Sequence, residues 1–240
     1  MPIKISAKMK EEVKVALDEY NALLSKAQKD ENIDLSEHVN KVSFDAFEEL
    51  KKEPEYSALE VLTGERDAYQ NIILMRETVD HTPTKAYSKL SLQKYVALVV
   101  ELRLYKNVAR RKNIRDIQTA REFGDLSENA EYQIAREQQG KIESHILDLE
   151  YVVSNCEIIE PKDGYTTGEI GSTVTIMNLK TKQQRTFVLT GSYESDINSV
   201  PQKISNESPI GAAVMGKKAG DNAIVVTNRG RDMYKIVSIK

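Results

Sequence analysis

Two stretches of the chain repeat hydrophobic residues at helical spacing, and a short polar segment separates them. In the later stretch the steps alternate between four and three residues, which is the heptad pattern of a coiled coil, at Ala135, Gln139, Ile142, Ile146, Leu149, Val153 and Cys156. The earlier stretch carries the facing stripe at Leu92, Tyr95, Val99, Leu102, Ala109, Ile114 and Ile117. The pattern predicts an antiparallel coiled coil over residues 88–156.

The polar segment between the two stretches carries turn signals. Gly124 stands where a left-handed C-terminal cap would end the first helix, and Asp125 or Ser127 can cap the second. We call residues 124–132 the tip segment, because the chain is expected to reverse there.

Residues 1–85, called the extension below, read as helical and polar. One amphipathic stripe includes Val13, Leu17 and Leu24, and a second helix is expected after Ser36. A third is expected from about Glu55 to Val79, broken or kinked near Thr63 and Gly64. His38, His81 and His145 are far apart in the chain, so each is interpreted as a surface or packing residue rather than as a metal ligand.

Residues 157–240 change to the two-residue period of strands. Strands are expected at 172–177, 185–190, 223–227 and 233–239. Ser208 and Pro209 open a short helix as N-cap and first helical residue, and Gly216 closes it. The whole chain is therefore expected to be an α+β multidomain protein with a helical extension, a long helical hairpin and a C-terminal α+β domain.

Composition restricts the class of protein. No stretch approaches the roughly 18 apolar residues of a transmembrane helix, and the first residues lack the apolar run of a signal peptide, so a cytoplasmic protein without membrane contact is expected. Cys156 is the only cysteine, which excludes an intrachain disulfide and a cysteine-based metal site. It is interpreted as inert core on the coiled-coil seam.

Positive charge is concentrated in one helix, although the formal net charge of the chain is −3. Residues 103–121, called the basic run below, hold one acid, Asp116, and seven bases: Arg103, Lys106, Arg110, Arg111, Lys112, Arg115 and Arg121. Such a run is either a solvated helix face or a patch that meets phosphates or an acidic partner.

The tip segment carries two carboxylates that allow two interpretations. Asp125 followed three residues later by Glu128 is the spacing of a capping box, which would be purely structural. Alternatively, exposed carboxylates at the end of a long hairpin could complete a Mg²⁺ site in another protein, because Mg²⁺ is bound by one or two carboxylates together with waters and substrate phosphates.

The tip segment closely resembles the signature of the bacterial Gre transcript cleavage factors. The resemblance extends through Ala135 to Gln139 and returns in two C-terminal segments, Ser208-Pro209-Ile210-Gly211 and Gly216 to Asp221. It implies an N-terminal coiled coil and a C-terminal domain of FKBP-like fold. It also implies a factor that binds bacterial RNA polymerase at the rim of its secondary channel and stimulates hydrolytic cleavage at the 3′ end of backtracked RNA.

By this resemblance, Asp125 and Glu128 occupy the acidic tip positions that help to hold a Mg²⁺ ion of the polymerase active site. The protein would bind no cofactor alone and would be no enzyme itself. Ser208, Pro209, Ile210 and Gly211 would take part in docking on the polymerase. Contacts with the nascent RNA 3′ end or the channel wall would come from Arg110, Arg111, Lys112, Arg121, Asn129, Tyr132 and Arg136.

Typical Gre factors lack the first 85 or so residues, whose partner is unknown, so the extension could serve an additional partner, oligomerisation or autoinhibition. Some relatives are inhibitors or other secondary-channel binders with altered tips. A non-cleaving regulator is therefore the alternative function, although the presence of both Asp125 and Glu128 favours cleavage. A prolyl isomerase is disfavoured, because the C-terminal domain has few aromatic residues for an apolar pocket.

Overall fold

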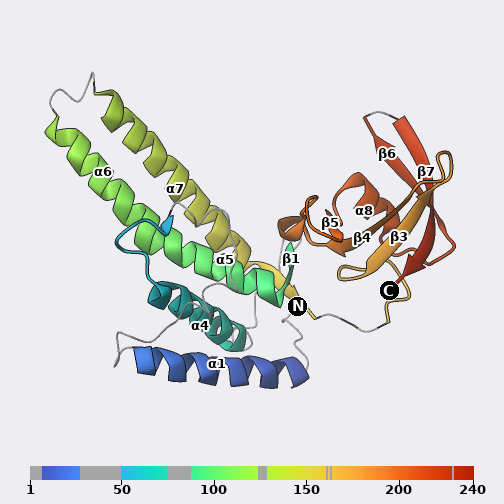
Figure 1. The fold of residues 1–240 in the computed structure, drawn as a ribbon, viewed down its shortest axis with the longest axis horizontal. Helices are drawn as coiled ribbons and strands as arrows, with labels where there is room; N and C mark the ends of the chain where they lie inside the picture. Colours follow the sequence, from blue (N-terminus) through green and yellow to red (C-terminus); the bar gives the residue numbers. More distant parts are fainter. Residues whose placement is uncertain are drawn as a thin grey trace. The chain divides into compact units, whose positions relative to one another are not determined.

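The structure of the chain is a computed structural model that describes residues 7–27, 50–74, 88–123, 129–160, 162, 164–228 and 230–240 (Figure 1). The described residues form two compact units. Unit 1 contains those up to residue 74 and those from 95 to 155, and unit 2 contains residues 88–94 and those from 156 onward.

Unit 1 is built around the predicted helical hairpin. Helix α5 (Leu92–Leu104), the π-helical turn η1 (Tyr105–Ala109) and helix α6 (Arg110–Glu122) follow one another without a break. Helix α7 (Ala130–Ser154) returns against α6 and η1. Most of the predicted α7 seam is confirmed, because five of its residues are buried: Ala135, Ile142, Ile146, Leu149 and Val153.

The facing stripe in α6 is shifted from its predicted register. Ile114 is 43% exposed, whereas Asn113 and Ile117 are buried, so the prediction that Ile114 faces α7 is wrong. The π-helical turn η1 is the physical reason, because a turn closed by i to i+5 hydrogen bonds rotates the residues after it relative to an unbroken α-helix.

Within the described part of the extension, two helices belong to unit 1. Helix α4 (Ala58–Leu74) lies alongside α5, and helix α1 (Ala7–Ala27) packs on α4 (Figure 1). The predicted break near Gly64 is wrong: α4 is continuous there, and Gly64 instead lets the helix approach the Val100 backbone closely. The helix expected after Ser36, apart from Leu50, lies outside the described residues, as do His38 and His81.

The core of unit 1 joins the extension to the hairpin. Leu50 and Val61 share one buried cluster with residues of both hairpin helices: Val100, Leu104, Val108, Ala109, Ile142 and Ile146. Between α1 and α4, the Tyr20 and Tyr69 rings stack with centroids 5.4 Å apart. Burial, followed by the nearby Glu65 carboxylate, raises the pKa of both phenols. The extension therefore folds against the hairpin over residues 50–74.

Unit 2 begins with a small parallel sheet that sequence periodicity missed. Strand β1 (Ser88–Ser91) pairs with strand β2 (Cys156–Ile159). Cys156 is therefore the first residue of a strand, and its predicted place on the coiled-coil seam is wrong because α7 ends at Ser154. The thiol is buried, which raises its pKa to about 12, so its prediction as unreactive core stands on these grounds.

The larger sheet of unit 2 has five strands in the order β5-β4-β3-β7-β6. All four predicted strands are confirmed: β3 (Thr173–Asn178), β4 (Gln184–Thr190), β6 (Asn222–Thr227) and β7 (Gly230–Ile239). Strand β5 (Gln202–Ser205), which was not predicted, runs parallel to β4 and follows the short helix η2 (Ser192–Glu194).

Helix α8 (Pro209–Val214) supplies Val214 to the core of this sheet, which includes Phe187 and Ile236. The predicted helix start is confirmed, because Ser208 is the N-cap and Pro209 the first helical residue. Gly216, with φ +71°, follows the helix end as predicted. None of the described helices is long and apolar enough to cross a membrane.

Candidate functional site

Asn129 joins the two hairpin helices next to the tip segment's predicted acids. Its Oδ1 accepts a hydrogen bond from the Tyr132 backbone N–H (3.0 Å) and so caps α7. Its Nδ2 donates to the carbonyl oxygen of Ala120 (2.6 Å), in the last turn of α6. One side chain therefore satisfies a free donor of α7 and fixes where α7 starts relative to the end of α6.

The N-cap of α7 corrects the capping-box prediction. The helix begins at Ala130 with Asn129 as its cap, so neither Asp125 nor Ser127 is that cap, and Glu128 is not at its third helical position. Gly124, Asp125 and Glu128 themselves lie outside the described residues. Glu131 lies in the first turn of α7, where a carboxylate is favoured by the helix dipole.

Arg121 and Tyr132 lie against each other across the hairpin. The guanidinium of Arg121 is 5.7 Å from the centroid of the Tyr132 ring, within the range of a cation–π contact. Two apolar side chains nearby in sequence are exposed, Phe123 (71%) and Ile134 (66%). The described residues on either side of the connection between α6 and α7, 121–123 and 129–134, thus combine a cation, an aromatic ring and exposed apolar side chains.

Arg136 and Asn113 show two different environments within the hairpin. Arg136 is exposed on α7, and its Nη1 donates to the Gln139 side chain. Asn113 is buried, and its Nδ2 donates to the carbonyl oxygen of Ala135 (2.8 Å). Asn113 was missed by the sequence reasoning, because the apolar stripe pointed to its neighbour Ile114.

Acids from two parts of the chain pair with the basic run, and the first group lies on α7. Arg110 Nε and Nη2 donate to the two carboxylate oxygens of Glu143 at 2.7 and 2.6 Å. This contact lowers the pKa of Glu143 and raises that of Arg110. Lys106 Nζ lies 2.6 Å from Glu150 Oε1. These pairs hold α7 against η1 and the start of α6.

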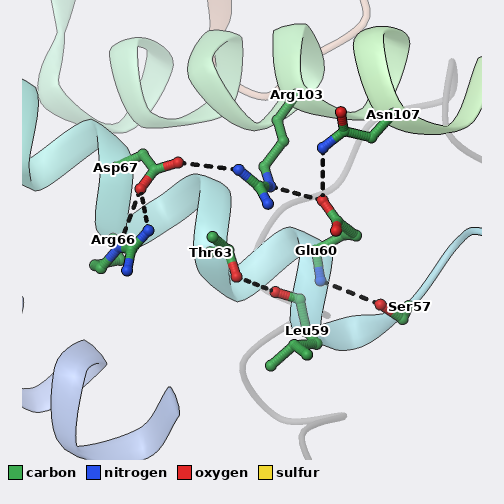
Figure 2. A network of polar contacts seen from close by, with 8 residues as sticks. All are labelled: Ser57, Leu59, Glu60, Thr63, Arg66, Asp67, Arg103 and Asn107. Atoms are coloured by element: carbon green, nitrogen blue, oxygen red, sulfur yellow. Dashed lines mark hydrogen bonds and ion pairs between the residues drawn. The ribbon is translucent and has the colours of Figure 1, made fainter. Parts of the chain in front are cut away.

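The extension provides the second side, from residues 50–74, which we call the cover. Figure 2 shows Arg103 between two carboxylates of α4, with Nε 2.6 Å from Glu60 Oε2 and Nη1 3.1 Å from Asp67 Oδ2. Asn107 Nδ2 donates to the same Glu60 oxygen at 3.0 Å. Before α4 begins, Arg115 pairs with Glu53 (3.0 Å) and with Glu55.

The predicted contacts Arg110, Arg111 and Lys112 therefore differ in their surroundings. Arg110 is engaged by Glu143, and Lys112 lies 3.0 Å from Asp116 and 3.9 Å from Glu53. Arg111 is exposed, and the described residues place no salt bridge on it. Sequence charge alone could not separate Arg110 from Arg111, because Glu143 lies 33 residues away from Arg110 in the chain.

Ser208, Pro209, Ile210 and Gly211 lie together at the start of α8. Ser208 Oγ accepts from the Gly211 N–H (3.0 Å) and donates to the Ser205 carbonyl oxygen (2.7 Å). A Cβ at position 211 would overlap that carbonyl group, so glycine is required there. Capping and close packing thus explain three of the four residue types locally.

Within the described ranges, no group of three or more His, Cys, Asp or Glu side chains could hold a metal ion. His145 is bound instead to Glu101, with 2.8 Å between Nε2 and Oε1, and its ring lies against that of Tyr105. These contacts are those of a half-buried packing residue, one of the two roles interpreted from the sequence.

Comparison with known proteins accounts for the hairpin and the sheet domain together. Residues 88–158 match the family described as "Transcription elongation factor, N-terminal", and residues 167–240 match "Transcription elongation factor, GreA/GreB, C-term". Transcription elongation factor GreA of Cereibacter sphaeroides is 42% identical over 146 residues, which are 61% of this chain and 95% of that protein. GreA of Rickettsia typhi is 42% identical over 141 residues, 58% of this chain and 86% of the relative.

Two solved structures match 65% and 40% of this chain. GreA factor homolog 1 (Gfh1) of Thermus thermophilus has a TM-score of 0.31 and 24% identity, covering 65% of this chain and 99% of that one. GreA/GreB from Nitrosomonas europaea has a TM-score of 0.28 and 24% identity, covering 40% and 78%.

These sequence matches define a class, the transcription elongation factors. The chain belongs to the GreA/GreB family of that class. Both family matches begin at residue 88 or later, so α1 and α4 lie before the matched residues.

Proposed function

We propose that this protein binds bacterial RNA polymerase through the secondary channel and stimulates hydrolytic cleavage at the 3′ end of a backtracked transcript. The observation that carries the proposal is 42% identity to a transcription elongation factor GreA along 95% of that relative's length. The protein would act as a cofactor of the polymerase's own nuclease activity rather than as an enzyme.

The hairpin supports this role by its construction. Helices α6 and α7 pack on one another, and residues 124–128, which include Asp125 and Glu128, connect them. Asn129 fixes the α7 end of this connection to the last turn of α6. Because residues 124–128 follow directly on two packed helices, their acidic side chains are well placed to be presented to another protein.

Asp125 and Glu128 are the residues proposed to reach the polymerase active site. Carboxylate oxygens are the donors that Mg²⁺ prefers, and a Mg²⁺ ion of the polymerase would there polarise a phosphoryl oxygen and activate a water. Because α7 is capped by Asn129, the capping of this helix does not require either carboxylate.

The remaining proposed contacts surround this pair. Arg121, Tyr132 and Asn129 flank the connection and would meet the RNA 3′ end, and Arg136 and Arg111 are exposed cations for the channel wall or the RNA backbone. Arg110 and Lys112 would contribute only if their acidic partners release them. Unit 2, proposed to be FKBP-like, would dock on the polymerase through the residues at the start of α8.

The test is a stalled, backtracked elongation complex of bacterial RNA polymerase supplied with the full chain. Addition of the wild-type protein should release short 3′ RNA fragments on a gel. The double substitution Asp125→Asn with Glu128→Gln should reduce the cleavage rate by at least about 100-fold, because it removes both charges while preserving size.

Two results would contradict the proposal. Equal cleavage by the double variant and the wild type would remove the role of the acidic pair. Slower nucleotide addition without any 3′ fragment from the wild-type protein would instead identify a non-cleaving regulator of the channel.

A further inference from the structure

The cover places carboxylates on two arginines of the basic run, Arg103 and Arg115. Arg110 and Lys106 are matched by Glu143 and Glu150 within the hairpin. Arg103 and Arg115 are matched instead by four acids of the cover: Glu53, Glu55, Glu60 and Asp67. The cover therefore presents acids where a polyanion or an acidic protein surface would otherwise bind.

The apolar part of the same interface comes from a few residues of the cover. Leu50 and Val61 enter the buried cluster of the hairpin, Tyr56 packs against it, and Gly64 brings the two helix backbones together. The cluster continues beneath them between the hairpin helices, from Val100 to Ile142 and Ile146. The hairpin thus retains a core of its own where the cover leaves it.

The polar contacts between Arg103 and α4 are partly exposed to solvent. The side chains of Arg103, Glu60 and Asp67 are each about 30% exposed, so water and competing charges reach them. Glu55 Oε2 is buried without a hydrogen-bond partner among the described residues. This loss of hydration raises the free energy of the state in which the cover is packed on the hairpin.

The cover also changes the cross-section of the hairpin. Helix α4 lies alongside α5, and α1 packs on α4, so the hairpin is at least one helix thicker there than between α6 and α7 alone (Figure 1). Each helix with its side chains is about 10 Å across. Beyond Arg115, the last base paired with the cover, α6 continues for seven residues, or about 10 Å, to Glu122.

We propose that the cover is an autoinhibitory element: it must leave Arg103 and Arg115 before the hairpin can enter the polymerase channel to its full depth. This inference rests on the proposed function, since it concerns entry into that channel. The polymerase and the cover compete for the same hairpin surface. In the free protein, the acids of the cover favour the form in which the cover is packed on the hairpin.

Weakening the cover by isosteric substitution tests the electrostatic part. Glu60→Gln with Asp67→Asn removes both charges from Arg103 without changing volume. At protein concentrations below saturation, this variant should bind the elongation complex and stimulate cleavage about fivefold more strongly than the wild type, as the loss of two partly exposed charge pairs allows. Glu11→Gln with Asp18→Asn, at exposed positions of α1, is the matched control and should behave as the wild type.

Locking the cover tests the same proposal in the opposite direction. Glu60 and Asn107 point at one another, so cysteines at both positions can be bridged by a short thiol-specific crosslinker that a reductant removes. The native Cys156 is buried, so it should react much more slowly than the two introduced cysteines. The bridged full chain should lose at least about tenfold in polymerase binding and in cleavage, and reduction should restore both.

The outcomes separate this inference from the proposed function. If the bridged protein binds and cleaves as well as its reduced form, the cover does not inhibit, while the proposed function stands. If no form of the protein supports cleavage, the proposed function fails. The inference about the cover is then tested by comparing polymerase binding of the bridged protein with that of its reduced form. Equal binding by bridged and reduced protein, or no gain from the weakened cover, would overturn the inference.

Discussion

At the scale of single residues, two asparagine side chains between α6 and α7 fix how these helices are joined. Asn129 caps α7 and holds Ala120 of α6, while Asn113 holds the Ala135 carbonyl inside the hairpin. Both are amides, which can use a donor and an acceptor at once. An apolar residue at either place could not make these bonds.

Replacing Asn129 by alanine should destabilise the hairpin by about 1 kcal/mol, because the Tyr132 N–H loses its acceptor and the link to Ala120 is lost. A lowering of the melting temperature by about 2–4 °C is expected, as measured by circular dichroism.

Asn129→Ser is the matched control for this substitution. Serine retains an acceptor for the helix N-terminus but cannot reach the Ala120 carbonyl in the same way, so about half of the loss should be recovered. A melting temperature unchanged in Asn129→Ala would show that the cap contributes nothing to stability.

At the scale of elements, two glycines in helices have opposite surroundings. Gly64 lies in α4, where an added Cβ would stand 3.0 Å from the Val100 Cα, and Gly140 lies in α7 with nothing within 4 Å of such a Cβ. Both occupy helix interiors, where alanine is intrinsically preferred by about 1 kcal/mol. The difference between them is therefore purely one of packing.

We expect Gly140→Ala to raise the free energy of unfolding by about 0.5–1 kcal/mol, since helix propensity acts there without a clash. Gly64→Ala should lower it despite the same gain, because the backbones of α4 and α5 must move apart. Urea unfolding of both variants checks this, and stabilisation by Gly64→Ala would contradict the close approach of the two helices.

At the scale of the whole molecule, the two units have separate buried cores. The core of the hairpin and cover includes Val61, Val100 and Ile146, whereas that of the five-stranded sheet includes Phe187 and Ile236. Cys156 belongs to the second unit and is buried there, so its thiol reports on the opening of that unit.

Phe187→Leu should weaken the sheet domain by about 1 kcal/mol through the cavity that it leaves. Labelling of Cys156 by a thiol reagent under native conditions should then accelerate about fivefold, because opening precedes reaction. Val61→Ala, which acts on the other core, should leave the labelling rate unchanged. Equal acceleration by both variants would mean that the units open together.

The elements with clear periodicity were predictable, and the exceptions have identifiable physical causes. The α7 seam, four strands of the larger sheet and the capped start of α8 follow from spacing and cap residues. The position of Ile114 was missed because a π-helical turn rotates α6, and the short strands β1, β2 and β5 offer too few residues for a two-residue period. The N-cap of α7 was misplaced because several residues of the tip segment can act as caps.

The sequence by itself determined the hairpin, the sheet domain and the family, because these depend on local periodicity and on short motifs. It also placed Asp125 and Glu128 between the two hairpin helices, a consequence of their position in the chain. Only the tertiary structure decided how the basic run is used, because the partners of Arg103 and Arg115 lie 36 or more residues away in the chain. Charge pairing at that separation is set by which helix surfaces pack together, and for Arg103 these are the surfaces of α4 and α5 (Figure 2).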